Sequence, residues 1–106
     1  MLFIETSTFT KRLPRHLDDD SYAALQGFLS VHPEAGDVIR GTGGIRKIRW
    51  AAAGRGKRGG TRVVYYWLAA EDHLYMLTLY DKTAKDDLTP AERDALRKTV
   101  EELDND

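Results

Sequence analysis

The chain contains no cysteine, which excludes disulfide bonds, thiolate metal ligands and a cysteine nucleophile. It also has no apolar run of about 18 residues, the length that a membrane-spanning helix needs. The apolar stretch before Glu5 is too short for a secretion signal. These absences predict a cytoplasmic protein that does not act at a membrane. With 106 residues and 42% hydrophobic content, residues 1–106 are expected to form a single domain with one core.

Acidic residues are missing from one long stretch of the chain, residues 38–70, which we call the basic segment. Its 33 residues contain eight of the sixteen Lys and Arg residues, so the formal net charge of −1 hides a strong separation of charge. A concentrated cationic surface attracts phosphate groups by Coulomb steering and counterion release. The basic segment therefore predicts a polyanionic partner. Its eight bases are Arg40, Arg46, Lys47, Arg49, Arg55, Lys57, Arg58 and Arg62.

The spacing of hydrophobic residues predicts an α/β (α+β) fold, in which N-terminal helices and a C-terminal helix pack on a mainly antiparallel sheet. Strands are predicted at residues 2–5, 45–50, 61–68 and 73–80, with the last three forming a meander. Helices are predicted at residues 7–13, closed by Pro14, and at residues 18–32. A third helix is expected to begin after Thr89, because Pro90 and Glu92 complete an N-terminal capping signature.

Two short motifs in the sequence do not predict a cofactor or metal site. Residues 54–59 fit the G-x-G-x-x-G pattern, but a strand follows them, whereas a dinucleotide site requires a helix at that point. The three histidines, at positions 16, 32 and 73, lie on different predicted elements without the spacing of metal ligands. We therefore expect no cofactor and no metal.

The arrangement of the basic segment leaves two explanations open. Lys47 and Arg49 alternate with Ile48 and Trp50, which predicts a strand with one cationic face, and Arg62 adds a base to the neighbouring strand. Such charges can simply protect a solvated edge strand from aggregation. The second explanation is that the clustered cations bind a polyanion. The absence of any compensating acid favours this explanation.

Four runs of the sequence carry a family resemblance: Gly36-Asp37-Val38-Ile39-Arg40-Gly41-Thr42-Gly43-Gly44-Ile45-Arg46-Lys47-Ile48-Arg49-Trp50-Ala51, Gly56-Lys57-Arg58-Gly59-Gly60-Thr61-Arg62-Val63-Val64-Tyr65-Tyr66, Leu77-Thr78-Leu79-Tyr80-Asp81-Lys82 and Asp87-Leu88-Thr89. Together they resemble the RelE superfamily of toxins, and within it the HigB-type branch. The resemblance implies a type II toxin–antitoxin toxin that enters the ribosomal A site and cuts mRNA without a metal ion. The ribose 2′-hydroxyl would attack the adjacent phosphate and leave a cyclic phosphate. It also implies a helix-turn-helix antitoxin of the HigA type, through which alone the toxin would reach operator DNA.

In-line attack by a 2′-oxygen needs a base, positive charge at the phosphate and an acid for the departing oxygen. The basic segment has no carboxylate or histidine, so a lysine is considered as the base, while arginines stabilise charge. By resemblance, Lys47 and Arg49 match the basic pair of the family's second strand, and Arg62 matches the arginine of the next. Lys57 lies in the glycine-rich loop and Lys82 at the end of the final strand. The predicted RNA contacts are Arg46, Arg55, Arg58, Tyr66 and Tyr80.

The sequence also departs from the RelE pattern near its C-terminus. The tyrosine that serves the chemistry there has no counterpart, because Asp87 and its neighbours occupy that region, and Thr83 replaces an expected arginine. A non-catalytic RNA- or ribosome-binding module on the same fold is therefore the alternative, and a protein-interaction domain is a third possibility. Arg93 and Lys98, on the predicted final helix, are expected to contribute little.

Overall fold

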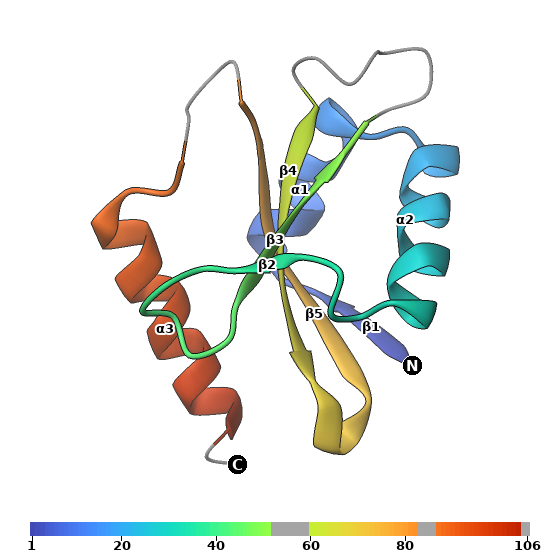
Figure 1. Ribbon diagram of the computed structural model, residues 1–106. Helices are drawn as coiled ribbons and strands as arrows, with labels where there is room; N and C mark the ends of the chain where they lie inside the picture. The colour runs from blue at the N-terminus through green and yellow to red at the C-terminus, as the bar shows by residue number, and fades with distance from the viewer. Residues whose placement is uncertain (52–59, 83–86, 105–106) are drawn as a thin grey trace.

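The structure is a computed structural model that describes residues 1–51, 60–82 and 87–104. A five-stranded sheet lies between α1 and α2 on one side and α3 on the other (Figure 1), which confirms the predicted α+β class. The strands are β1 (Leu2–Glu5), β2 (Asp37–Val38), β3 (Arg46–Trp50), β4 (Thr61–Leu68) and β5 (His73–Asp81). The helices are α1 (Ser7–His16), α2 (Asp19–Val31) and α3 (Pro90–Asp104), with a short 3-10 turn at Ala69–Glu71.

The strand order is β1-β5-β4-β3-β2, so the central part of the sheet is the predicted antiparallel meander. Strand β1 adds to its edge parallel to β5, and the two-residue β2, which hydrophobic periodicity did not predict, closes the opposite edge. Register in the meander places Arg49 opposite Arg62, and Arg62 opposite Tyr80. Arg49, Arg62 and Tyr80, which are far apart in the sequence, thus become neighbours across the sheet.

Helices cover both faces of the sheet, so the domain has two hydrophobic clusters where one core was expected. The first cluster lies under α1 and α2 and contains Phe9, Leu17, Leu25, Leu29, Val63, Tyr65, Leu74, Met76 and Leu79. The second lies under α3 and contains Ile39, Ile45, Val64, Tyr66, Leu77, Tyr80, Leu88 and Val100. When both faces of a sheet are covered, few side chains on its strands can reach solvent. Charged side chains on β3 and β4 must therefore lie where no helix covers the sheet.

The first helix is longer than the sequence predicted. Thr6 caps it by accepting the Phe9 N–H at 3.1 Å, and the helix continues through Pro14 to His16. A proline so close to a helix end removes one N–H donor from the last turn. The Leu17 N–H still reaches the Leu13 carbonyl at 3.0 Å, so the final turn closes regardless.

Side chains also cap the other two helices, and the capping box predicted for α3 is confirmed. Asp18 accepts the Ser21 N–H at 2.7 Å and so caps α2. At the start of α3, the Thr89 hydroxyl accepts the Glu92 N–H at 3.1 Å, and the Glu92 carboxylate accepts the Thr89 N–H at 2.9 Å. This reciprocal pair fixes where α3 begins. None of the helices in the described residues is both long and apolar enough to span a membrane.

The connection between α2 and β2 is fastened to the core by one phenol. The Tyr65 hydroxyl accepts the Gly36 N–H at 2.8 Å and donates to the Pro33 carbonyl at 2.9 Å. The backbone approaches closely enough that a Cβ on Gly36 would lie 2.8 Å from the Tyr65 ring and 2.9 Å from the Lys47 carbonyl oxygen. Glycine is therefore required at position 36 for space.

We expect Gly36→Ala to lower the free energy of unfolding by about 1–3 kcal/mol, because the added methyl group overpacks a contact with backbone. Gly27→Ala is the matched control, since a Cβ there meets no atom within 4 Å. In a helix this change should raise stability by about 0.5–1 kcal/mol. Urea unfolding of both variants measures the two effects. Equal stabilities would contradict the steric argument.

Candidate functional site

Lys47, Arg49 and Arg62 lie on one side of the sheet, and we call these three residues the cationic face. On β3, Ile48 and Trp50 pack against the first hydrophobic cluster, so the alternate residues Lys47 and Arg49 point to the α3 side. On β4, Val64 and Tyr66 belong to the second cluster. Arg62 has the same parity as these two residues and therefore lies on the α3 side as well.

Arg49 and Arg62 are directly opposite each other in the β3–β4 register. Like charges in that position destabilise a sheet, which makes the pair costly unless an anion lies against it. Arg49 is exposed, and its stem packs over Gly60, where a Cβ would lie 3.2 Å from Arg49 Cγ. Arg62 is half-buried and donates to the Gly60 carbonyl at 3.3 Å. The glycine thus allows both guanidinium groups to occupy the same end of the hairpin.

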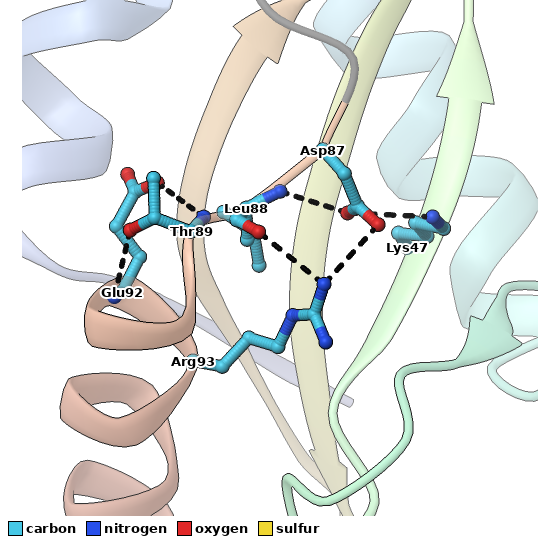
Figure 2. Close-up of polar contacts among 6 residues, drawn as sticks. All are labelled: Lys47, Asp87, Leu88, Thr89, Glu92 and Arg93. Carbon is cyan, nitrogen blue, oxygen red and sulfur yellow. Dashed lines mark hydrogen bonds and ion pairs between the residues drawn. The ribbon is translucent and has the colours of Figure 1, made fainter.

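Figure 2 shows that the cationic face is connected to the start of α3 by Asp87. The Lys47 ammonium nitrogen lies 3.6 Å from Asp87 Oδ1, and Arg93 Nη2 lies 3.5 Å from Asp87 Oδ2. The Leu88 N–H donates to Asp87 Oδ1 at 2.8 Å. Arg93 also donates to the Leu88 carbonyl at 3.4 Å. One carboxylate therefore joins β3, the turn before α3 and the first turns of α3.

The environment of Asp87 keeps its carboxyl group ionised. Partial burial opposes ionisation, but the Leu88 N–H and the charges of Lys47 and Arg93 outweigh it and hold the pKa of Asp87 below its usual 3.8. At neutral pH this group can accept hydrogen bonds but has no proton to donate.

The pKa of the Tyr80 phenol is raised, whereas that of the nearby Asp87 carboxyl group is lowered. Burial, and then the nearby charge of Asp87, raise the pKa of Tyr80 above 10.0, although the charge of Arg62 acts in the opposite direction. The phenol is therefore protonated at any physiological pH. Because Tyr80 is opposite Arg62 in the sheet, it is the tyrosine that the register places beside the cationic face.

The structure separates several of the predicted RNA contacts from the cationic face. Arg46 has the parity of Ile48, and its guanidinium donates to the carbonyl oxygens of Glu34 at 3.0 Å and Gly36 at 2.8 Å. Arg46, predicted as an RNA contact, thus holds the α2–β2 connection on the side of the sheet opposite to the cationic face. Tyr66 and Tyr80 are buried in the second cluster, so neither ring offers a face for stacking on a base.

The remaining predicted site residues are only partly described. Lys82 is exposed just beyond the end of β5. The adjacent Asp81 carboxylate contacts His16 at 3.1 Å and Thr61 at 3.3 Å. Arg55, Lys57 and Arg58, and the position of Thr83, lie outside the described residues. In the part of the chain that the structure does describe, no group of three or more His, Asp or Glu residues could hold a metal ion.

The sequence did not predict that Asp87 and Arg93 lie at the cationic face. Arg93 was expected to contribute little, yet it lies beside Asp87 at the cationic face. A sequence signal for it existed, because an arginine near the start of a helix opposes the positive end of the helix dipole. A nearby anion offsets this unfavourable interaction, and Asp87 is an acid that lies just before the cap.

Comparison with known proteins assigns this domain to a family. Residues 31–105 match the family described as the RelE toxin of the RelE/RelB toxin–antitoxin system. The chain belongs to the RelE toxin family. The match covers β2 through α3, and therefore includes every described residue of the cationic face together with Asp87 and Arg93.

Solved structures agree with that fold. A mutant E. coli RelE toxin in the free state is 16% identical, with a TM-score of 0.56 over 80% of this chain and 86% of that chain. A chain of the intact E. coli RelBE toxin–antitoxin complex is 18% identical, with a TM-score of 0.54 over 74% of this chain and 92% of that chain. At these identities the likeness shows the RelE fold.

We expect replacement of Lys47 by Met or of Arg93 by Gln to raise the pKa of Asp87, because each change removes a positive charge that stabilises its carboxylate. A group with a lowered pKa stabilises the fold above its unfolded-state value and loses this contribution as the pH falls through the lowered value. The stabilisation by Asp87 is thus complete at neutral pH. An NMR titration of the Asp87 carboxyl carbon measures the shift.

Arg97→Gln is the control for this titration. Arg97 lies one helical turn beyond Arg93, and its ion pairs are with Asp94 and Glu101 instead. Its replacement should leave the Asp87 midpoint where it is. An Asp87 midpoint that stays the same in all three variants would show that Lys47 and Arg93 do not interact with the carboxylate in solution.

Proposed function

We propose that this RelE-family toxin inhibits translation as a ribosome-dependent endonuclease that cuts mRNA in the A site. The observation that carries the proposal is the pairing of Arg49 with Arg62 on the uncovered part of the sheet, with Lys47 beside them. An RNA phosphate is an anion of the right charge to offset this arrangement, and arginine binds phosphate oxygens with two parallel hydrogen bonds. Membership of the RelE toxin family supports the same activity.

The proposed reaction is attack of the ribose 2′-oxygen on the adjacent phosphate. The bond from phosphorus to the departing 5′-oxygen breaks, leaving a 2′,3′-cyclic phosphate and a free 5′-hydroxyl. Arg62 and Arg49 stabilise the negative charge that develops on the phosphate oxygens. Because their guanidinium groups are always protonated, they can supply this charge without a metal ion.

Proton transfer in this proposal involves lysines and one tyrosine. Lys47, or Lys57 in the glycine-rich loop, accepts the proton of the 2′-hydroxyl while in its unprotonated amine form and so becomes an ammonium group. Lys82 is a further cation near the end of β5. Tyr80 is protonated and is opposite Arg62, so it is the candidate that resembles the missing C-terminal tyrosine in chemistry. Its phenol would have to reach the departing oxygen through the edge of the second cluster.

We further propose that the toxin belongs to the HigB-type branch and acts in the cytoplasm. The glycine-rich run between β3 and β4, which contains Lys57, carries this resemblance. A cognate helix-turn-helix antitoxin would neutralise the toxin and connect it to operator DNA. The alternative is a module that binds RNA or ribosomes without cutting, and the burial of Tyr80 is the observation that favours it.

Purified protein should cut mRNA on translating ribosomes and leave cyclic-phosphate ends, but should scarcely cut naked RNA. The reason is that the described site contains no conventional acid–base pair and depends on another body to hold the substrate in line. Arg62→Ala should lower the rate by about a hundredfold, because loss of one preorganised donor costs about 3 kcal/mol. Primer extension on ribosome-bound mRNA measures both effects.

Lys98→Ala, on α3 and away from the cationic face, removes an exposed cation and serves as the control. It should cut as fast as the unaltered protein. Ribosome binding without any cleavage would favour the non-catalytic module. Full activity of a correctly folded Arg62→Ala variant would show that the reaction occurs elsewhere on the protein.

The antitoxin contact is proposed to lie away from the cationic face. The end of α2 exposes apolar side chains, with Val31 71% and Phe28 37% exposed. Next to them is an open hollow of about 600 Å³ that continues over Pro33. Leu2 on the edge strand β1 is 54% exposed. Stable protein contacts need apolar area, which these surfaces offer and a glycine-rich cationic loop does not.

Val31→Asp should weaken binding of the cognate antitoxin at least about tenfold, because it places a charge in an apolar contact. Arg62→Ala should change the affinity by less than about threefold at low salt, since the remote contact does not include it. Ala95→Asp adds the same charge to an exposed position of α3, on the other side of the sheet, and is the control. Calorimetric titration decides between the two surfaces. A large loss for Arg62→Ala that disappears with added salt would place the antitoxin on the cationic face.

A further inference from the structure

Several contacts restrain Asp87, although it lies in the connection between β5 and α3. The next residue, Leu88, is buried in the second cluster, and Thr89 begins the reciprocal cap of α3. The Leu88 N–H directs Oδ1, and Arg93 directs Oδ2 from the next turn of the helix. The carboxylate is therefore anchored on the α3 side before it contacts β3 at all.

Lys47 has the opposite character, because a lysine side chain is long and loses considerable rotamer entropy when it is fixed. It extends from β3 and is only partly buried, and its described ion pair is with Asp87 at 3.6 Å. A reaction that depends on the position of an ammonium or amine nitrogen requires that nitrogen to be restrained. The anchored carboxylate is the group in contact with Lys47 that can provide the restraint (Figure 2).

We propose that Asp87 is a positioning residue for Lys47, and that Arg93 holds Asp87 in place from α3. This inference rests on the proposed function, because Lys47 must take part in RNA cleavage for its position to matter. Asp87 itself does not touch the RNA in this arrangement. Its removal should therefore lower kcat, whereas KM should change little.

A competing explanation is that the Asp87 carboxylate occupies the place of an RNA phosphate between Lys47 and Arg93 and is displaced by substrate. The hydrogen bond from Leu88 argues against it, because Oδ1 is part of the turn that precedes α3. An anion that must leave during each reaction would not be expected to share its oxygen with that turn. The two explanations predict opposite effects of removing the charge, so one set of variants separates them.

Asp87→Asn is the decisive substitution, since it keeps the shape and an oxygen that can accept the Leu88 N–H but removes the charge. We expect kcat on translating ribosomes to fall about tenfold while KM stays within about twofold. The thermal midpoint should fall slightly at neutral pH, because the stabilisation by the ionised carboxylate is lost, but the variant should remain folded. Asp94→Asn, which neutralises an exposed acid on α3, is the matched control and should cut normally.

A double-mutant cycle then tests whether Asp87 acts through Lys47. In a Lys47→Met background, Asp87→Asn should cause no further loss, because the group that it positions is already absent. Arg93→Gln should resemble Asp87→Asn and add little to it, and Arg93→Lys should recover part of the activity. Arg97→Gln is the control for the loss of an α3 arginine.

One measurement does not depend on cleavage. The NMR order parameter of the Lys47 Cε group should fall in Asp87→Asn, and that of Lys98 should not. Unchanged order of Lys47 would overturn the inference, as would faster cleavage by Asp87→Asn or an equal loss in the Lys47→Met background. If the unaltered protein does not cut ribosome-bound mRNA, the proposed function fails, and the order parameter alone decides whether Asp87 positions Lys47.

Discussion

The structure depends on a sheet whose two faces are both covered by helices. This constraint leaves few places where β3 and β4 can carry charge. On the α3 side, Val64 and Tyr66 are used to pack the helix, whereas Arg62, two residues before Val64, lies toward the hairpin end of the strand. In Figure 1 that end rises above the beginning of α3. The cations therefore gather where the helix no longer covers the sheet.

The cationic face can attract an anion only if the acids elsewhere in the chain do not neutralise it. Among the described residues, Asp87 is the acid that contacts the cationic face through Lys47, and its pKa is lowered by a backbone N–H and two cations. A single carboxylate cannot neutralise Lys47, Arg49, Arg62 and Arg93 together. The cationic face therefore keeps a net positive charge that attracts an anion, while Lys47 forms an ion pair with Asp87.

The resemblance to RelE toxins places a tyrosine near the C-terminus, in the region that Asp87 occupies here. In this chain, that region carries a carboxylate that cannot donate a proton at neutral pH, and the protonated phenol nearby is Tyr80 on β5. The chain shares the RelE fold, and the groups that the structure places near the cationic face are Asp87 and Tyr80. This difference makes the identity of the acid the central chemical question of the site.

The sequence by itself determined the features that depend on neighbouring residues. Four of the five strands were predicted to within one residue at each end, and so were the capping box of α3 and the alternation of Lys47 and Arg49 with apolar residues, because each is a local pattern of spacing. Tertiary structure decided the rest. It assigned Arg46 to the far side of the sheet, buried Tyr66 and Tyr80, and brought Asp87 and Arg93 to Lys47. Lys47 and Asp87 are 40 positions apart in the sequence and are brought together by the packing of α3 on the second cluster. No local pattern encodes that contact.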